Sequence, residues 1–172
     1  MADLTELLDG IDHRLWQEFE GRLRSLRECG RGKVLIFGNG GSAAIAEHVA
    51  LDYTKAARLP CLTLSSSPMM SCFANDFGYE HSQMAFIKYF AKSEDVIILI
   101  SSSGNSQNIV NCADYCEKND LTYYTFTGFS NSSLLRQINP DVNFWIPVNH
   151  YNHVENAHQF ILLSICDSLR EG

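Results

Sequence analysis

The sequence lacks three features that mark common classes of protein: an apolar run of membrane-spanning length, a basic stripe and a C-x-x-C pair. Because residues 1–10 are also polar and acidic, we expect no signal peptide, no transmembrane helix and no membrane partner. The net charge of −7 without a basic stripe argues against direct nucleic-acid binding. Any anion that the protein binds must then be held by local backbone dipoles.

The six cysteines suggest the compartment in which the chain folds. Cys61, Cys112 and Cys166 stand inside apolar patterns, where a thiol behaves as a small apolar side chain. We therefore expect reduced thiols in a cytoplasmic protein rather than a disulfide framework.

The 172 residues fit a single domain, with an N-terminal helix over 3–29 and an α/β core over 33–172. Apolar residues at spacings of three and four predict that long helix, with a break near Gly10. Short apolar runs predict buried strands at 33–37, 61–64, 96–100, 123–126 and 142–146. Helices are expected between them, at 42–58, from Ser67-Pro68 onward, and at 80–92, 106–119, 132–138 and 154–170. Alternating strands and helices indicate a mainly parallel sheet with helices on both faces.

The first candidate site follows the third predicted strand, where the sequence reads Ser101-Ser102-Ser103-Gly104-Asn105-Ser106 and leads into a helix. We call residues 101–106 the serine loop. Hydroxyls and a glycine at a helix N-terminus, where unpaired N–H groups meet the positive end of the helix dipole, suit a phosphate group. An ordinary Ser/Gly turn that caps a helix explains the same composition equally well.

A second glycine-rich turn, Gly38-Asn39-Gly40-Gly41-Ser42-Ala43-Ala44, follows the first predicted strand. Its G-x-G-G spacing fits a dinucleotide fingerprint only loosely. Ser65 to Ser67 stand after the second strand, where a ribose-binding carboxylate is expected. A nucleotide-binding oxidoreductase is therefore a remote alternative, and we expect no nucleotide cofactor.

Three motifs in this order, G-N-G-G-S-A-A at 38–44, A-N-D-F-G at 74–78 and S-S-S-G-N-S at 101–106, resemble the sugar isomerase (SIS) domain family, and most of all its phosphoheptose isomerase branch. The resemblance covers nearly the whole chain. It implies a three-layer αβα sandwich with a five-stranded parallel sheet, the flavodoxin-like SIS fold. It also implies a phosphorylated sugar as substrate, sedoheptulose 7-phosphate or a relative, and a homotetramer with sites at subunit interfaces.

The resemblance also implies the roles of individual residues. The phosphate would be held by serines of the serine loop, and the sugar would face Asn39, Ser42 and Asp76. On the residues alone, Asn75-Asp76 would be interpreted as part of a turn. The full set implied to bind substrate is Asn39, Gly40, Gly41, Ser42, Asn75, Asp76, Ser101, Ser102, Ser103, Asn105, Ser106 and Glu155.

Isomerisation between an aldose and a ketose needs a base beside a carbon acid and a group that polarises the carbonyl. The family places a His and a Glu four residues apart on one helix, and here the pair is His48 and Asp52, which spacing puts on one helical face. Asp52 would be the general base. The family's last-helix glutamine is Glu155 here, and its last-helix histidine is replaced by Leu163.

A metal site is a tentative part of the same interpretation. In the family the four catalytic positions can hold zinc, and here His48, Asp52, Glu155 and His158 offer two carboxylates and two imidazoles. His158 stands on an apolar helix, so a hydrogen-bonded core histidine is the stronger expectation for it. Because Leu163 replaces a catalytic histidine, a non-catalytic sensor or regulatory protein, like the replication-initiator-associating branch of the family, stays open beside the isomerase.

Overall fold

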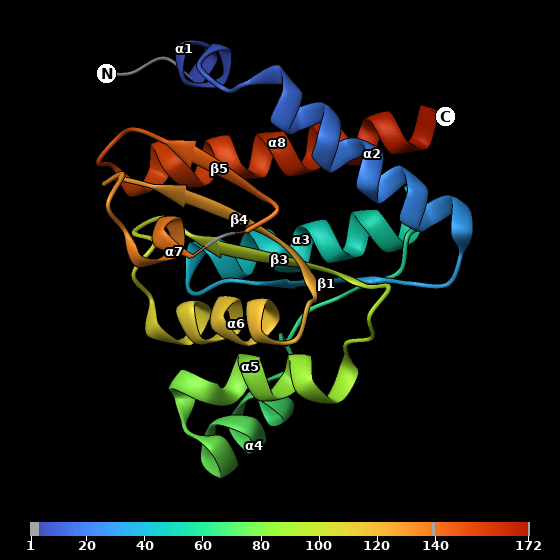
Figure 1. Ribbon diagram of the computed structural model, residues 1–172, viewed down its shortest axis with the longest axis vertical. Coiled ribbons are helices and arrows are strands. Elements are labelled where there is room, and N and C mark those ends of the chain that lie inside the picture. Colours follow the sequence, from blue (N-terminus) through green and yellow to red (C-terminus); the bar gives the residue numbers. More distant parts are fainter. Residues whose placement is uncertain (1–3, 139, 172) are drawn as a thin grey trace.

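The computed structural model describes residues 4–138 and 140–171, which form one parallel sheet between two layers of helices (Figure 1). The strands run in the order β2-β1-β3-β4-β5, and all pairs are parallel. Their bounds are β1 (Val34–Phe37), β2 (Cys61–Leu62), β3 (Val96–Ser101), β4 (Thr122–Gly128) and β5 (Val142–Ile146). The predicted α/β sandwich with a five-stranded parallel sheet is confirmed. β2 is shorter than predicted, since it is an edge strand paired only with Val34 and Leu35 of β1.

The helices come close to their predicted positions. They are α1 (Leu4–Asp9), α2 (His13–Cys29), α3 (Gly41–Lys55), α4 (Ser67–Phe77), α5 (Tyr79–Phe90), α6 (Gln107–Lys118), α7 (Leu134–Gln137) and α8 (Tyr151–Glu171). The predicted break near Gly10 is confirmed, because Asp12 caps α2 by accepting a hydrogen bond from the Arg14 amide at 2.9 Å. α8 begins three residues earlier than predicted.

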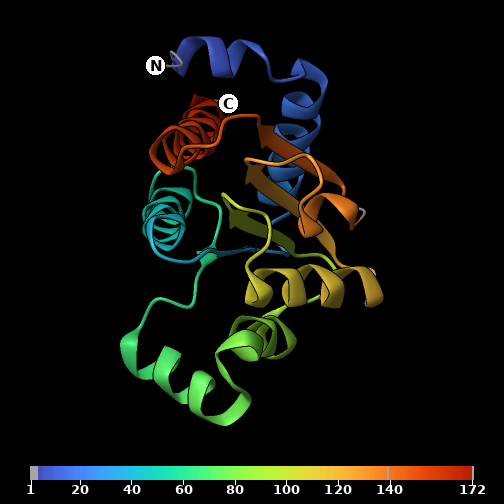
Figure 2. The ribbon, with the colours of Figure 1, turned by 90° about the vertical axis from the view of Figure 1, so that its left-hand side faces the viewer.

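Successive strand residues face opposite helical layers. Ile36, Ile98 and Phe126 belong to a core that includes residues of α2, α3 and α8. Leu35, Leu99 and neighbouring residues belong to a second core with α5 and α6. Figure 2 shows these two layers on either side of the sheet, with α4 packed on α5 at one end of the molecule. The continuous apolar runs therefore reflect strands that are buried on both faces.

The structure bears on two expectations from the sequence, that the cysteines stand in apolar surroundings and that no helix crosses a membrane. Cys61, Cys112 and Cys166 are buried as their apolar surroundings predict, and burial raises the pKa of the Cys116 thiol to about 12. Across the described part of the chain, no helix combines the length and apolar character that crossing a bilayer requires.

The strand order creates a crevice at the centre of the sheet. From β1 the chain passes through α3 to β2 on one side, and from β3 it passes through α6 to β4 on the other side. β1 and β3 are neighbours in the sheet, so the loops that follow them leave adjacent carboxyl ends and run in opposite directions. Such a switch point is where open α/β sheets bind ligands.

Candidate functional site

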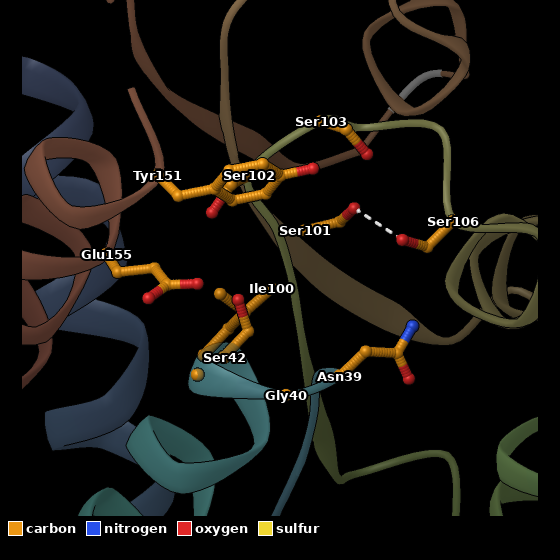
Figure 3. A pocket seen from close by; sticks show the side chains of 11 residues that line it. Asn39, Gly40, Ser42, Ile100, Ser101, Ser102, Ser103, Ser106, Tyr151 and Glu155 are labelled. Atoms are coloured by element: carbon orange, nitrogen blue, oxygen red, sulfur yellow. Dashed lines mark hydrogen bonds between the residues drawn. The ribbon is translucent and has the colours of Figure 1, made fainter. Parts of the chain in front are cut away.

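A cavity of about 290 Å³ lies at this switch point (Figure 3). It is walled by the loop after β1, the serine loop after β3 and the first turns of α8. The lining residues are Asn39, Gly40, Gly41, Ser42, Ile100, Ser101, Ser102, Ser103, Ser106, Tyr151 and Glu155. Two loops that are more than sixty residues apart in the sequence thus form one pocket.

The serine loop supplies hydroxyl groups to this pocket. Ser101 and Ser102 are each 4% exposed, and the Ser101 hydroxyl donates to the Ser106 Oγ at 3.2 Å. The Ser102 Oγ is buried and has no hydrogen-bond partner within residues 4–138 and 140–171. A buried hydroxyl without a partner is uncommon in native proteins. Because Ser102 directly follows β3 in the pocket wall, we expect a bound anion to satisfy its hydroxyl.

Gly104 allows the serine loop to turn sharply against its neighbours. Its φ of 65° lies in the left-handed region, and a Cβ at this position would come within 2.3 Å of the Ser133 Oγ. The next residue, Asn105, accepts a hydrogen bond from the Leu134 amide at 2.9 Å. Asn105 is absent from the pocket lining, and its predicted contact with substrate stays a prediction. Its side chain holds the loop against α7 instead.

The loop after β1 is held by a network of side-chain amides. Asn39 exchanges two hydrogen bonds of 2.8 Å with Asn108 and accepts a third from the Tyr79 hydroxyl at 2.9 Å. Gln83 accepts from Asn108 and donates to the Gly38 carbonyl, both at 3.0 Å. Asn108 and Gln83 are buried, so the network holds the loop after β1 in place from the protein interior. The structure places Asn39, Gly40, Gly41 and Ser42 in the pocket wall, as expected for a substrate site.

α8 closes the other side of the pocket with two side chains. A Cβ built on Gly41 would lie 2.3 Å from the Glu155 Oε2, so the carboxylate packs directly on the first residue of α3. Tyr151, one turn earlier, is 58% exposed, and its ring contacts Phe129 at 4.8 Å between centroids. Sequence reasoning missed Tyr151 because the helix was expected to begin at residue 154. Its position four residues before Glu155 was the available signal.

The proposed catalytic pair lies apart from this pocket. His48 Nε2 and Asp52 Oδ2 are 3.3 Å apart on one face of α3, as their spacing predicts. Gln159 of α8 lies beside them, with its Nε2 3.5 Å from the His48 Nδ1. Neither member of the pair lines the cavity. At about 1.5 Å per residue along α3, His48 lies about 10 Å beyond Gly41.

Asn75 and Asp76 do not reach the pocket of the same chain. They lie near the end of α4, where the Asn75 amide donates to the Asp76 Oδ1 at 2.9 Å and both side chains are exposed. α4 packs on α5, away from the loops that form the cavity (Figure 2). That these two residues face the sugar therefore stays a prediction, one that the pocket of a single chain does not include.

The described part of one chain does not bring the tentative four-residue metal set together. Among the described residues no three His, Cys, Asp or Glu side chains are grouped so that they could hold a metal. His158 is fully buried, and its Nε2 donates to the Thr127 carbonyl oxygen at 3.0 Å. Burial lowers the pKa of His158 to about 4, which keeps the ring neutral. The stronger expectation, a hydrogen-bonded core histidine, is confirmed.

Comparisons with known proteins agree with this fold. A family model described as the SIS domain matches residues 2–128. The phosphoheptose isomerase of Syntrophotalea carbinolica is 28% identical over 98% of this chain and 89% of its own length. That of Sodalis glossinidius is 31% identical over 82% of this chain and 77% of its own length. The phosphoheptose isomerase structure from Neisseria gonorrhoeae has a TM-score of 0.87 at 23% identity, covering 96% of this chain and 91% of that one. The chain therefore belongs to the SIS domain family.

Proposed function

We propose that this protein is a phosphosugar isomerase that interconverts an aldose and a ketose phosphate, with sedoheptulose 7-phosphate or a related sugar as substrate. The observation that carries the proposal is the serine loop at the switch point, with the buried and unpartnered Ser102 hydroxyl in the pocket wall. The curated relatives named above are phosphoheptose isomerases, which supports the same reaction class.

The phosphate binds at the start of α6. Hydroxyls of Ser101, Ser102, Ser103 and Ser106 donate to its oxygens, while the positive end of the α6 dipole favours its negative charge. No lysine or arginine lines the cavity among the described residues, so hydrogen bonds and the helix dipole supply the attraction. This matches the expectation that an acidic chain binds anions through local dipoles.

The reacting end of the sugar then lies along α3 and α8, toward His48 and Asp52. In a linear sugar phosphate the phosphate and the carbonyl stand at opposite ends, which agrees with a catalytic pair that lies about 10 Å along α3 from Gly41 of the pocket wall. The Asp52 carboxylate takes a proton from the hydroxyl-bearing carbon beside the carbonyl and returns it to the former carbonyl carbon. The His48 ring moves the proton of that hydroxyl to the former carbonyl oxygen, so the hydroxyl becomes the new carbonyl.

The residue at the family's second histidine position limits this chemistry. Leu163 is partly buried against the core and supplies no proton-transfer group. His48 must therefore serve alone beside Asp52. Gln159 lies beside the His48 ring and helps to hold its orientation.

Zinc is a separate part of the proposal. His48 and Asp52 are suitable ligand types and would supply two of the usual four, but the described residues of one chain bring no third ligand to them. No step of the reaction is therefore assigned to a metal here. Metal analysis of the purified protein, with His48→Ala as the comparison, tests whether zinc is bound.

The oligomeric state is proposed as a homotetramer. Leu51 of α3 and Phe160 of α8 are 60% and 47% exposed, and a second copy could cover them. Light scattering at several concentrations would decide between monomer, dimer and tetramer. We further propose a cytoplasmic location, which the buried thiols of Cys61, Cys112 and Cys116 support because a reducing compartment keeps such groups free.

Turnover of sedoheptulose 7-phosphate, followed with and without added zinc, tests the activity. We expect an aldose product from the wild type and a loss of at least about 100-fold in kcat for Asp52→Asn, since general-base catalysis is worth about that much. Asp9→Asn, an equal change on the exposed face of α1, should keep full activity. Binding of the sugar phosphate without turnover would contradict the isomerase and favour the regulatory alternative.

A further inference from the structure

α8 brings two polar side chains to the pocket, and they differ in what they offer to an anion. Glu155 packs on Gly41, and an ionised carboxylate only accepts hydrogen bonds. Tyr151, one turn earlier on the same helical face, carries a phenol hydroxyl that can donate. Of these two side chains, Tyr151 is therefore the one that can bind a phosphate oxygen.

The Tyr151 side chain is directed toward the phosphate end of the pocket. Figure 3 shows it reaching from the start of α8 toward the serine loop. Within the part of the chain that the structure describes, its hydroxyl has no hydrogen-bond partner. This donor is therefore available to a ligand that enters the cavity.

An aromatic contact holds the Tyr151 ring in place, although the residue is 58% exposed. Phe129, in the loop after β4, meets the ring edge to face, with 4.8 Å between the centroids and 79° between the planes. Phe129 itself has a φ of 54°, which bulky residues rarely adopt, and its amide donates to the Val148 carbonyl at 3.3 Å. The loop after β4 thus positions Tyr151 before a ligand arrives.

We propose that Tyr151 is a phosphate-binding residue, whose hydroxyl donates to the phosphate from the side opposite the serine loop and whose ring covers that end of the pocket. The inference rests on the proposed function, since it takes the serine loop as the phosphate site. It adds a donor from α8 to the serine hydroxyls that approach from the loop after β3.

The chemistry of a phosphate ester calls for such a donor. The group has three strong acceptor oxygens, and no lysine or arginine lines the cavity among the described residues. A phosphate oxygen that faces α8 meets either the Tyr151 hydroxyl or water. Because water can partly replace a donor at an exposed position, loss of this hydroxyl should lower affinity by about 5- to 20-fold, less than loss of a buried donor.

Calorimetry of Tyr151→Phe with sedoheptulose 7-phosphate and with inorganic phosphate tests the inference. The change removes the hydroxyl and keeps the ring beside Phe129. Both ligands should bind about 5- to 20-fold more weakly, because the lost contact is to the phosphate itself. The urea midpoint of the ligand-free protein should not change. Tyr89→Phe removes the hydroxyl of a tyrosine that is 66% exposed on α5, outside the pocket lining, and should leave both affinities unchanged.

The outcomes separate the role of Tyr151 from the proposed function. Wild-type affinity of Tyr151→Phe for both ligands overturns the role of Tyr151 and leaves the serine loop as the phosphate site. A loss confined to the sugar phosphate overturns it too, because the contact would then be to the sugar. So does a wild type that binds the sugar phosphate but not inorganic phosphate, since the phosphate would then lack contacts of its own. Failure of the wild type to bind either ligand overturns the proposed function, and the inference about Tyr151 with it.

Discussion

Replacing Ser102 with alanine should stabilise the ligand-free protein and weaken its binding of phosphate. The Ser102 side chain is 4% exposed, and its Oγ has no partner in the part of the chain that the structure describes. A buried hydroxyl left unpaired costs about 1–3 kcal/mol, so its removal should raise the free energy of unfolding by about 1 kcal/mol. A hydrogen bond to a charged group contributes about 1.5–3 kcal/mol, so the dissociation constant for the sugar phosphate should rise about 10- to 100-fold.

Ser133→Ala provides a matched control for this experiment. The Ser133 hydroxyl is also buried and unpartnered, yet Ser133 does not line the cavity. It should raise stability by a similar amount and leave affinity for the sugar phosphate unchanged. Urea unfolding of the ligand-free proteins and calorimetry with sedoheptulose 7-phosphate measure the two effects. If Ser102→Ala destabilises the protein, or binds the sugar phosphate as tightly as wild type, the assignment of Ser102 to the phosphate is refuted.

Three further predictions concern the groups around the pocket. Gly104→Ala should destabilise the protein by about 2 kcal/mol or more, because its φ of 65° is left-handed and the new Cβ would meet Ser133; an unchanged urea midpoint would contradict this. Asn108→Ala should cost about 1–3 kcal/mol and weaken sugar-phosphate binding, because Asn39 and Gln83 lose their partner. The pKa of His158 in the folded protein is about 4, against an ordinary value of 6.5. The free energy of unfolding should therefore fall by roughly 3 kcal/mol between pH 7 and pH 4, and His158→Gln should lose that part of the pH dependence.

The sign of the His158 prediction follows from proton uptake. Between pH 6.5 and 4 the unfolded chain binds a proton that the buried ring refuses, so stability falls with pH over that interval and is fully present above it. Urea unfolding of wild type and His158→Gln at pH 7, 5.5 and 4 measures the difference. Parallel pH dependences for the two proteins would show that His158 is not held neutral.

Local sequence patterns determined the layered fold and one half of the pocket. Short continuous apolar runs such as 96–100 suit strands covered on both faces, and the glycines and serines that follow them mark the carboxyl edge of the sheet. The serine loop was predictable for the same reason, because its place after a strand and before a helix is a property of adjacent residues.

Tertiary structure alone decided which side chains meet in the pocket. Asn105 sits within the predicted loop but turns to the Leu134 amide, while Glu155, some fifty residues later, packs on Gly41. His158 and Glu155 are three residues apart on α8, yet one faces the core and the other faces the cavity. The direction of a helical side chain depends on what packs on each face of its helix. The apolar pattern of α8 does not tell which of its faces packs on α3 and the sheet, so the sequence could not separate the places of His158 and Glu155.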